Sequence, residues 1–190
     1  MAPSEKVALV DLDGTLVDYA GRMAADLAAM ASPGEPTWSP WAPDLPAWLE
    51  RRMDAIKRQP GWWSGLPDFR LGHDLLAMLR EIGFDVHVLT KGPHRTTAAW
   101  TEKVEWCRRR LPADVKVTVT EDKGLVYGRV LVDDWPEYLL RWLEWRPRGL
   151  GIMPAHGYNA DFRHPRVVRY DGANADEVRA ALQAAYEREA

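Results

Sequence analysis

The chain has little of several features that would narrow its cellular setting. Cys107 is the only cysteine, so no disulfide can form within the chain, which suits a reducing compartment. No stretch approaches the ~18 apolar residues that a helix needs to cross a bilayer. The polar stretch from Met1 to Lys6 lacks the apolar region of a signal peptide. We therefore expect a cytoplasmic protein with no membrane partner.

An excess of positive charge is also missing. The formal net charge is -3, from 25 basic against 28 acidic side chains. Duplex nucleic acid is therefore not an expected partner, because its binding relies on a basic surface. A small anionic substrate is still compatible with this balance, since a metal ion and a few lysines set the charge of a site locally. The sequence does not determine the oligomeric state, and a homodimer is compatible with it.

Short apolar runs alternate with helical patterns along the 190 residues, a length that fits one α/β domain. The runs predict strands at residues 7–10, 86–89, 115–119 and 130–132, with further short strands near 150–152 and 167–168. This alternation predicts an α/β fold, a Rossmann-like parallel sheet with helices on both faces. Ligands of such sheets bind at the carboxyl ends of the strands. The acidic residues of this sequence follow those ends.

The sharpest motif is Asp11-Leu12-Asp13-Gly14-Thr15, directly after the first apolar run. Gly14 permits a break in the strand, so both carboxylates can face one cleft. One carboxylate can attack phosphorus to give an aspartyl-phosphate. The second can protonate the leaving oxygen and later deprotonate water. Such chemistry needs a hard cation, and Mg²⁺ prefers one or two carboxylates together with substrate oxygens and waters.

The motif has two other possible interpretations, a calcium-binding loop and a solvated turn. A calcium-binding loop starting at Asp11 would place Leu16 where the loop needs glycine and Arg22 where it needs glutamate, so the sequence fails that test. A solvated turn after an edge strand is compatible with the pentapeptide alone.

Three further features lie next to apolar runs of the sequence. Thr90 follows the second run, where its hydroxyl can hold phosphate oxygens, although a helix N-cap threonine explains it equally well. Lys123 precedes the fourth run and taken alone indicates only a surface lysine. Asp133-Asp134 ends that run, and adjacent carboxylates there are costly without a cation. A solvated turn explains the acidic pair as well.

Together and in this order, the four features resemble the four motifs of the haloacid dehalogenase superfamily, over roughly residues 5–20 and 65–140. The resemblance implies that Asp11 is the nucleophile and Asp13 the acid/base. Thr90 and Lys123 would hold phosphate. Asp11, Asp134 and the backbone carbonyl of Asp13 would bind Mg²⁺, and Asp133 would orient Lys123 or a metal-bound water.

A narrower resemblance is carried by several short stretches: Gly61-Trp62-Trp63, Leu66-Pro67, Leu89-Thr90, 99–103 (AWTEK), Glu121-Asp122-Lys123 and 131–134 (LVDD). They are similar to the 5'(3')-deoxyribonucleotidases, the cytosolic type C 5'-nucleotidases, which hydrolyse nucleoside monophosphates with magnesium. The resemblance implies a catalytic core at residues 1–18 and 65–190 and a small helical cap at 19–64. Where the family commonly has a small Ser-Pro after the threonine, this chain has Lys91-Gly92-Pro93, which adds a positive charge beside the phosphate.

The cap region is rich in tryptophan, and aromatic cap residues hold the base in this family. Tyr19, Trp38, Trp62 and Trp63 are the candidates for stacking on a nucleobase. A structural role, in which the rings hold a small subdomain together, is the alternative. For His156 a loop position near the active site and a plain polar role are both open.

We therefore predict a Mg²⁺-dependent phosphatase that hydrolyses nucleoside or deoxynucleoside monophosphates through an aspartyl-phosphate. One alternative is a phosphatase of another small ester, such as a sugar phosphate. Another is a non-catalytic nucleotide-binding protein, against which the complete set of acids and lysine argues. A dehalogenase is disfavoured, because that chemistry has no use for an acid at Asp13.

Overall fold

The structure is a computed structural model that describes residues 6–42, 44–94 and 96–189, so residues 1–5 of the predicted polar N-terminal stretch lie outside it. Six strands form one sheet, in which every neighbouring pair is parallel. The strands are β1 (Val7–Val10), β2 (Asp85–Lys91), β3 (Lys116–Thr120), β4 (Val130–Val132), β5 (Leu150–Pro154) and β6 (Val167–Tyr170).

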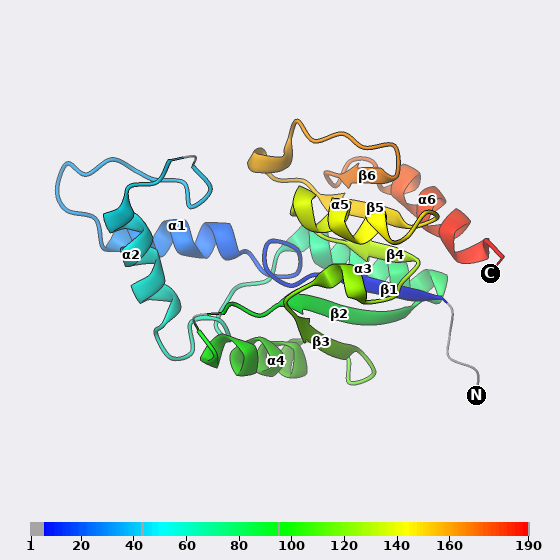
Figure 1. Ribbon diagram of the computed structural model, residues 1–190, viewed down its shortest axis with the longest axis horizontal. Coiled ribbons are helices and arrows are strands. Elements are labelled where there is room, and N and C mark those ends of the chain that lie inside the picture. The colour runs from blue at the N-terminus through cyan, green and yellow to red at the C-terminus, as the bar shows by residue number, and fades with distance from the viewer. Residues whose placement is uncertain (1–5, 43, 95, 190) are drawn as a thin grey trace.

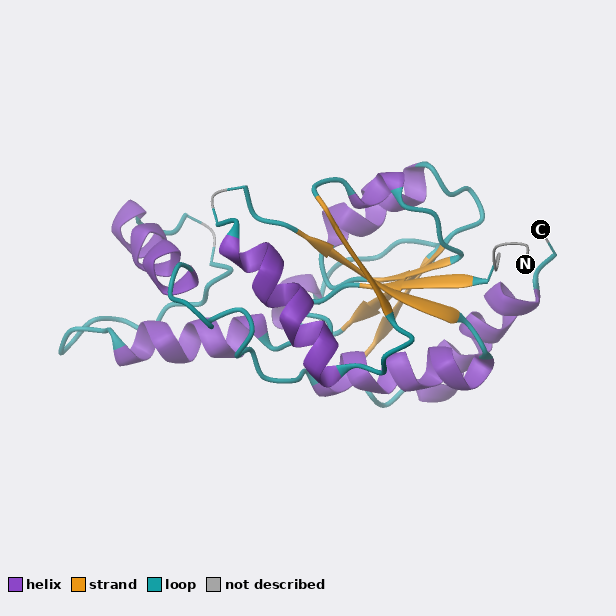
Figure 2. Ribbon diagram, turned by 90° about the horizontal axis from the view of Figure 1, so that it is seen from below, coloured by secondary structure: helices purple, strands orange, loops and turns teal. Residues whose placement is uncertain are grey.

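Helices connect and cover these strands. They are α1 (Tyr19–Ala29), α2 (Ala47–Lys57), α3 (Arg70–Ile82), α4 (Ala98–Arg110), α5 (Pro136–Glu144) and α6 (Ala175–Glu187), with short 3-10 turns η1 (Lys123–Leu125) and η2 (Gly157–Asn159). Figure 2 shows the strands with helices on either side of them. The predicted α/β fold with a parallel sheet is therefore confirmed.

The side chains of the central strand β1 divide between the two faces of the sheet, as the alternation of a strand requires. Ala8 and Val10 belong to a large buried cluster that includes the inward faces of α3 and α6. Leu9 points the other way and packs with the apolar face of α5, where Trp142 is fully buried. Both faces are thus covered, which explains why the strands are continuous apolar runs in the sequence.

The strand order β3-β2-β1-β4-β5-β6 determines where at the edge of the sheet a crevice forms. The chain proceeds outward from β1 to β3 and then returns to β4 on the opposite side of β1. The connections that follow β1 and β4 therefore diverge, and a crevice opens between their carboxyl ends. Asp11 follows β1, and Asp133 follows β4, so the topology brings the sequence motifs to this crevice.

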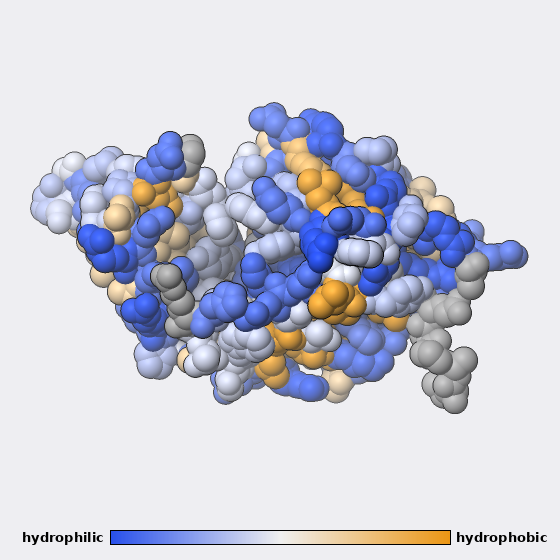
Figure 3. Space-filling model, viewed as in Figure 1, coloured by the Kyte–Doolittle hydropathy of each residue, from blue (hydrophilic) through white to orange (hydrophobic). Residues whose placement is uncertain are grey.

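The segment of residues 19–64 leaves the sheet between β1 and α3. Figure 1 shows α1 and α2 lying beyond the carboxyl end of β1, on the side away from both chain ends. The carboxylate of Asp18 accepts a hydrogen bond from the Gly21 amide at 2.8 Å and so caps the first turn of α1. In the space-filling view the two parts form separate lobes whose visible face is mainly hydrophilic (Figure 3).

Candidate active site

The turn after β1 fixes the first two acids. The Asp11 amide donates to the Val132 carbonyl at 2.8 Å, which ties the turn to β4. The Leu12 carbonyl then accepts bonds from three following amides, which wind the turn tightly. Gly14 has φ of +79°, and a Cβ there would collide with the Asp134 carboxylate. The position therefore requires glycine on two independent grounds.

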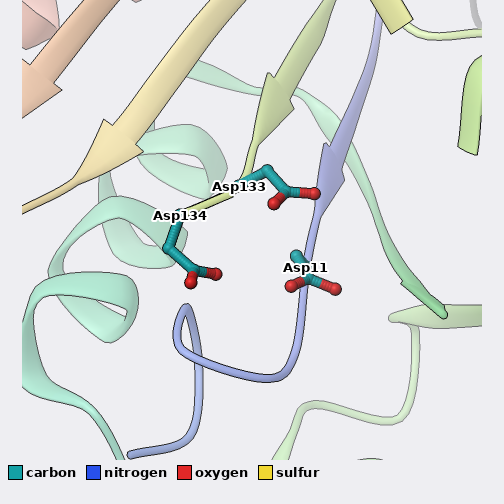
Figure 4. A group of neighbouring side chains, drawn as sticks. All are labelled: Asp11, Asp133 and Asp134. Carbon is teal, nitrogen blue, oxygen red and sulfur yellow. The ribbon is translucent and has the colours of Figure 1, made fainter. Parts of the chain in front are cut away.

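Three carboxylates gather at the ends of β1 and β4 (Figure 4). Asp11, Asp133 and Asp134 are all buried, and each offers an oxygen within 4.8 Å of the others. Lys123 lies between two of them, with Nζ 2.7 Å from Asp11 and 2.6 Å from Asp133. The solvated-turn interpretation of both acidic motifs is therefore wrong.

Burial and mutual repulsion disfavour three ionised carboxylates so close together. Burial raises the pKa of Asp134 well above its ordinary value, and the carboxylates of Asp133 and Asp11 raise it further. Burial also raises the pKa of Asp133 to about 7, although Lys123 opposes the shift. Asp11 and Asp133 in turn raise the pKa of Lys123 against its desolvation, so this ammonium stays charged.

Asp13 lies beside the cluster and has its own cation, Lys103. The Lys103 ammonium is paired with the Asp13 carboxylate, and it also donates to the Lys91 carbonyl at 2.6 Å and to Thr90 Oγ1 at 3.3 Å. Lys103 is 1% exposed, whereas the Asp13 side chain keeps 25% of its surface open. Burial raises the pKa of Asp13, and Lys103 opposes that rise.

The predicted phosphate-holding residues lie on the same side. Thr90 is fully buried inside β2, and α4 begins only at Ala98, so the N-cap alternative is wrong. Lys91 and Lys123 place their ammonium groups 5.0 and 4.7 Å from the centre of the Tyr138 ring, and all three residues line the same cavity. The prediction that they bind phosphate is compatible with this placement and is not tested by it.

A cavity of about 530 Å³ opens above the acids. Tyr19 and Trp63 line it, but Trp38 and Trp62 do not. Trp62 is 3% exposed and its indole N–H donates to Asp26, which turns its ring into the interior of the 19–64 segment. Trp38 packs edge-on against Trp48. These two rings therefore do not face the cavity, unlike those of Tyr19 and Trp63.

Several lining residues were missed at the sequence level. Trp41 and Trp135 complete the aromatic wall, with ring centres 5.1 Å apart. Lys103 is a basic residue of α4 and carries no local signal beyond the family-like stretch that contains it. Trp135 directly follows the acidic pair, which is a signal that could have been used.

The loop after β5 reaches the same site. The His156 side chain lies with Nε2 2.6 Å from the Gly14 carbonyl, and the Tyr158 hydroxyl donates to Asp134 Oδ2 at 2.5 Å. Burial lowers the pKa of His156, so the ring is neutral near neutral pH and its N–H donates to that carbonyl. Burial and the Asp134 carboxylate raise the pKa of Tyr158, which keeps its hydroxyl a donor. His156 thus contacts the turn that carries Asp11 and Asp13 and is not an isolated loop group.

The charge of the site fits a divalent cation. Asp11, Asp13, Asp133 and Asp134 lie around the two ammonium groups that pair with them, those of Lys103 and Lys123, so the carboxylates outnumber their paired cations by two. Oxygen ligands of this kind suit Mg²⁺ or a similar hard ion. A cation would also offset the repulsion that raises the pKa of Asp134.

The comparisons with known proteins agree with this geometry. The sequence matches the family described as "5' nucleotidase, deoxy (Pyrimidine), cytosolic type C protein" over residues 5–183. No curated protein matches it. In the described ranges, no helix has both the length and the apolar character that crossing a membrane requires.

Two solved structures resemble the fold. A haloacid dehalogenase-like hydrolase from Burkholderia xenovorans LB400 superposes with a TM-score of 0.51 at 17% identity, over 99% of this chain and 100% of that chain. A hydrolase from Streptococcus pneumoniae TIGR4 gives 0.39 at 17% identity, over 94% and 98%. The first likeness shows the fold alone, and the second is too weak to support an argument.

Proposed function

Because the chain belongs to the cytosolic type C family of 5' nucleotidases, which makes it an enzyme of the phosphatase type, we propose that its metal is Mg²⁺ and its substrates are nucleoside or deoxynucleoside monophosphates. The observation that carries this proposal is the buried cluster of Asp11, Asp133 and Asp134 beneath a cavity with aromatic walls. The acids supply phosphate chemistry, and the rings supply a surface for a base.

We propose that Asp11 attacks the phosphorus and that the bond to the ester oxygen breaks as the new one forms. Asp13 gives its proton to the leaving alkoxide, so the alcohol departs neutral. Water then attacks the aspartyl-phosphate, and Asp13 takes the proton from that water. Each turnover thus returns both carboxylates to their starting states.

The supporting residues act on charge and position. Lys123 holds the Asp11 carboxylate at 2.7 Å and contributes positive charge where the phosphoryl oxygens gather. Thr90 and Lys91 are the other residues that would bind the phosphate oxygens. Asp11, Asp134 and the Asp13 carbonyl would hold Mg²⁺, with Asp133 fixed beside them by Lys123. When bound, the ion neutralises phosphate charge in the transition state.

We propose that residues 19–64 form a cap that selects the substrate, and that residues 1–18 and 65–190 form the catalytic core. Tyr19, Trp41 and Trp63 come from this segment and line the same cavity as Lys91 and Lys123. Lys57 of α2 lines it as well and adds a polar group to the aromatic wall. A nucleoside monophosphate carries both an aromatic base and a phosphate. It therefore matches a cavity lined by aromatic rings and lysines better than a sugar phosphate does.

The test is a panel of nucleoside and deoxynucleoside 5'- and 3'-monophosphates, sugar phosphates and a generic aryl phosphate, each assayed with Mg²⁺ and with a chelator. We expect Mg²⁺-dependent turnover with kcat/KM highest for a nucleotide. Asp11→Asn should fold normally and lose turnover on every substrate, because an amide is a poor nucleophile and a poor ligand. A sugar phosphate preferred over all nucleotides would overturn the substrate assignment. Retention of a tenth of wild-type kcat in Asp11→Asn would overturn the mechanism.

A further inference from the structure

The carboxylate of Asp134 is held by a hydrogen bond on each of its oxygens. Thr15 Oγ1 donates to Oδ1 at 3.0 Å, and the Tyr158 hydroxyl donates to Oδ2 at 2.5 Å. Thr15 is fully buried, and Asp134 is 3% exposed. Two donors on the two oxygens fix the plane of the carboxylate as well as its place, which a single bond would not do.

The Tyr158 ring is itself fixed without help from the Asp134 side chain. It stacks on His156 with ring centres 4.7 Å apart and planes 14° apart, and His156 stacks on Phe69 at 4.6 Å. The neighbouring Asn159 side chain donates to the backbone carbonyls of Asp134 at 3.0 Å and of Pro154 at 2.9 Å. The hydroxyl is therefore presented to the carboxylate from a prearranged support.

Tyr158 thus touches the acid cluster without belonging to it. It does not line the cavity above the acids, so a direct role in substrate contact is not indicated. The centre of its ring also lies 5.4 Å from that of Trp41 and 5.7 Å from that of Trp135. The hydroxyl bond to Asp134 is the single polar contact of this side chain in the described part of the chain.

We infer that Tyr158 is a positioning residue for the metal: it orients the Asp134 carboxylate so that this side chain can bind the cation. The inference rests on the proposed Mg²⁺ site. Hydrogen-bonded partners of metal ligands commonly carry ~10–100-fold in metal affinity when they are removed. The rival interpretation is that the hydroxyl merely satisfies a buried acceptor, which would affect stability but not Mg²⁺ binding in particular.

The substitution Tyr158→Phe separates these interpretations, because it keeps the ring stack and removes only the hydroxyl. Tyr170→Phe is the matched control, since Tyr170 is a buried tyrosine whose hydroxyl donates to another carboxylate, Asp74, at 3.4 Å and outside the site. The first readout is the Mg²⁺ concentration at the midpoint of the rise in melting temperature, with Mg²⁺ alone as the ligand. The second is the Mg²⁺ dependence of kcat.

We expect Tyr158→Phe to raise the Mg²⁺ midpoint about tenfold or more, and saturating Mg²⁺ to restore most of kcat with KM for the substrate unchanged. Tyr170→Phe should leave the midpoint where it is. Suppose that Mg²⁺ raises the melting temperature of the wild type and that Tyr158→Phe has the same Mg²⁺ midpoint. This result would overturn the inference and leave the proposed function standing. A wild-type protein with no Mg²⁺ response would overturn both.

Discussion

Lys103 is the most important residue of the site whose role the sequence did not predict. It is a lysine with 1% of its side chain exposed, and its ammonium joins three separate partners: the Asp13 carboxylate, the Lys91 carbonyl and Thr90 Oγ1. The ammonium also lies 4.7 Å from the centre of the Trp63 ring. One cation therefore links the proposed acid/base, the proposed phosphate-binding residues Thr90 and Lys91, and the cavity wall.

Lys103→Met tests this link, because methionine fills similar space without charge. Asp13 would lose its cation in a buried place, so its pKa should rise further and its orientation should loosen. We expect kcat on a nucleoside monophosphate to fall ~10²-fold or more, the scale of one misplaced general acid. Steady-state kinetics together with a melting curve measures both effects.

Lys116→Met is the control for that experiment. Lys116 also pairs with an aspartate, Asp85, at 3.1 Å, but its side chain is 61% exposed. An exposed pair contributes at most about 1 kcal/mol, so stability and kcat should hardly change. Equal behaviour of the two variants would mean that Lys103 is an ordinary structural lysine.

The division between predicted and missed residues has a physical cause. Asp11, Asp13 and Asp133-Asp134 were identifiable because acids directly after apolar strands are costly unless a cation or a reaction requires them. Lys103 and Tyr158 were not identifiable from local sequence, since a lysine in a helix and a tyrosine in a loop are both ordinary on a surface. What makes them part of the site is the packing of α4 and of the β5 loop against the sheet, which a sequence pattern does not contain.

At the scale of elements, the connection between α1 and α2 places one of its two tryptophans in the wall of the cavity and the other outside it. Trp38 and Trp41 lie three positions apart in this connection, both half-buried, and neither indole N–H has a hydrogen-bond partner in the described part of the chain. Trp41 lines the cavity and Trp38 does not. The two residues therefore form a matched pair for testing base stacking.

Trp41→Leu should raise KM for a nucleoside monophosphate and leave a simple alkyl phosphate nearly unaffected, because only the base loses its stacking surface. One stacked ring contributes ~1–3 kcal/mol, which corresponds to roughly 5- to 150-fold in affinity. Trp38→Leu should lower the melting temperature without changing the ratio of kcat/KM between the two substrates. A parallel loss on both substrates in Trp41→Leu would assign that ring a structural role.

The elements themselves followed closely from apolar periodicity, with differences at their ends. The second strand was expected at residues 86–89 and runs from Asp85 to Lys91, so Thr90 is a strand residue and not a helix cap. The extra length comes from pairing with β3, where Thr90 lies opposite Val119. Polar strand ends of this kind are specified by the neighbouring strand and are therefore invisible in a one-dimensional pattern.

At the scale of the whole molecule, stability should depend on pH through His156. Burial lowers the pKa of this side chain from the ordinary 6.5, so the unfolded chain binds a proton that the folded protein excludes. The stabilising contribution of the neutral ring is complete above that value and is lost as the pH falls below it. The slope from one such group is at most about 1.4 kcal/mol per pH unit.

His156→Gln tests this dependence, because the glutamine amide can place an N–H near the Gly14 carbonyl but does not titrate. The difference in unfolding free energy between wild type and variant, measured by urea titration in a chelator, should shrink as the pH falls from 7 to 5. A chelator is needed because metal binding has its own pH dependence. A constant difference over this range would contradict the prediction.

The stretches that precede and follow the 19–64 segment, residues 16–18 and 67–69, lie side by side. The Asp18 amide donates to the Pro67 carbonyl at 2.8 Å, the Phe69 amide donates to the Leu16 carbonyl at 2.8 Å, and Val17 pairs with Asp68 between them. The two ends of the 19–64 segment are thus hydrogen-bonded to each other independently of the residues between them. Loop closure depends only weakly on length, so insertions and replacements within the segment cost little. We therefore expect that the segment can be replaced by a different insert while its two fastened ends, and the sheet from which they leave, keep their places.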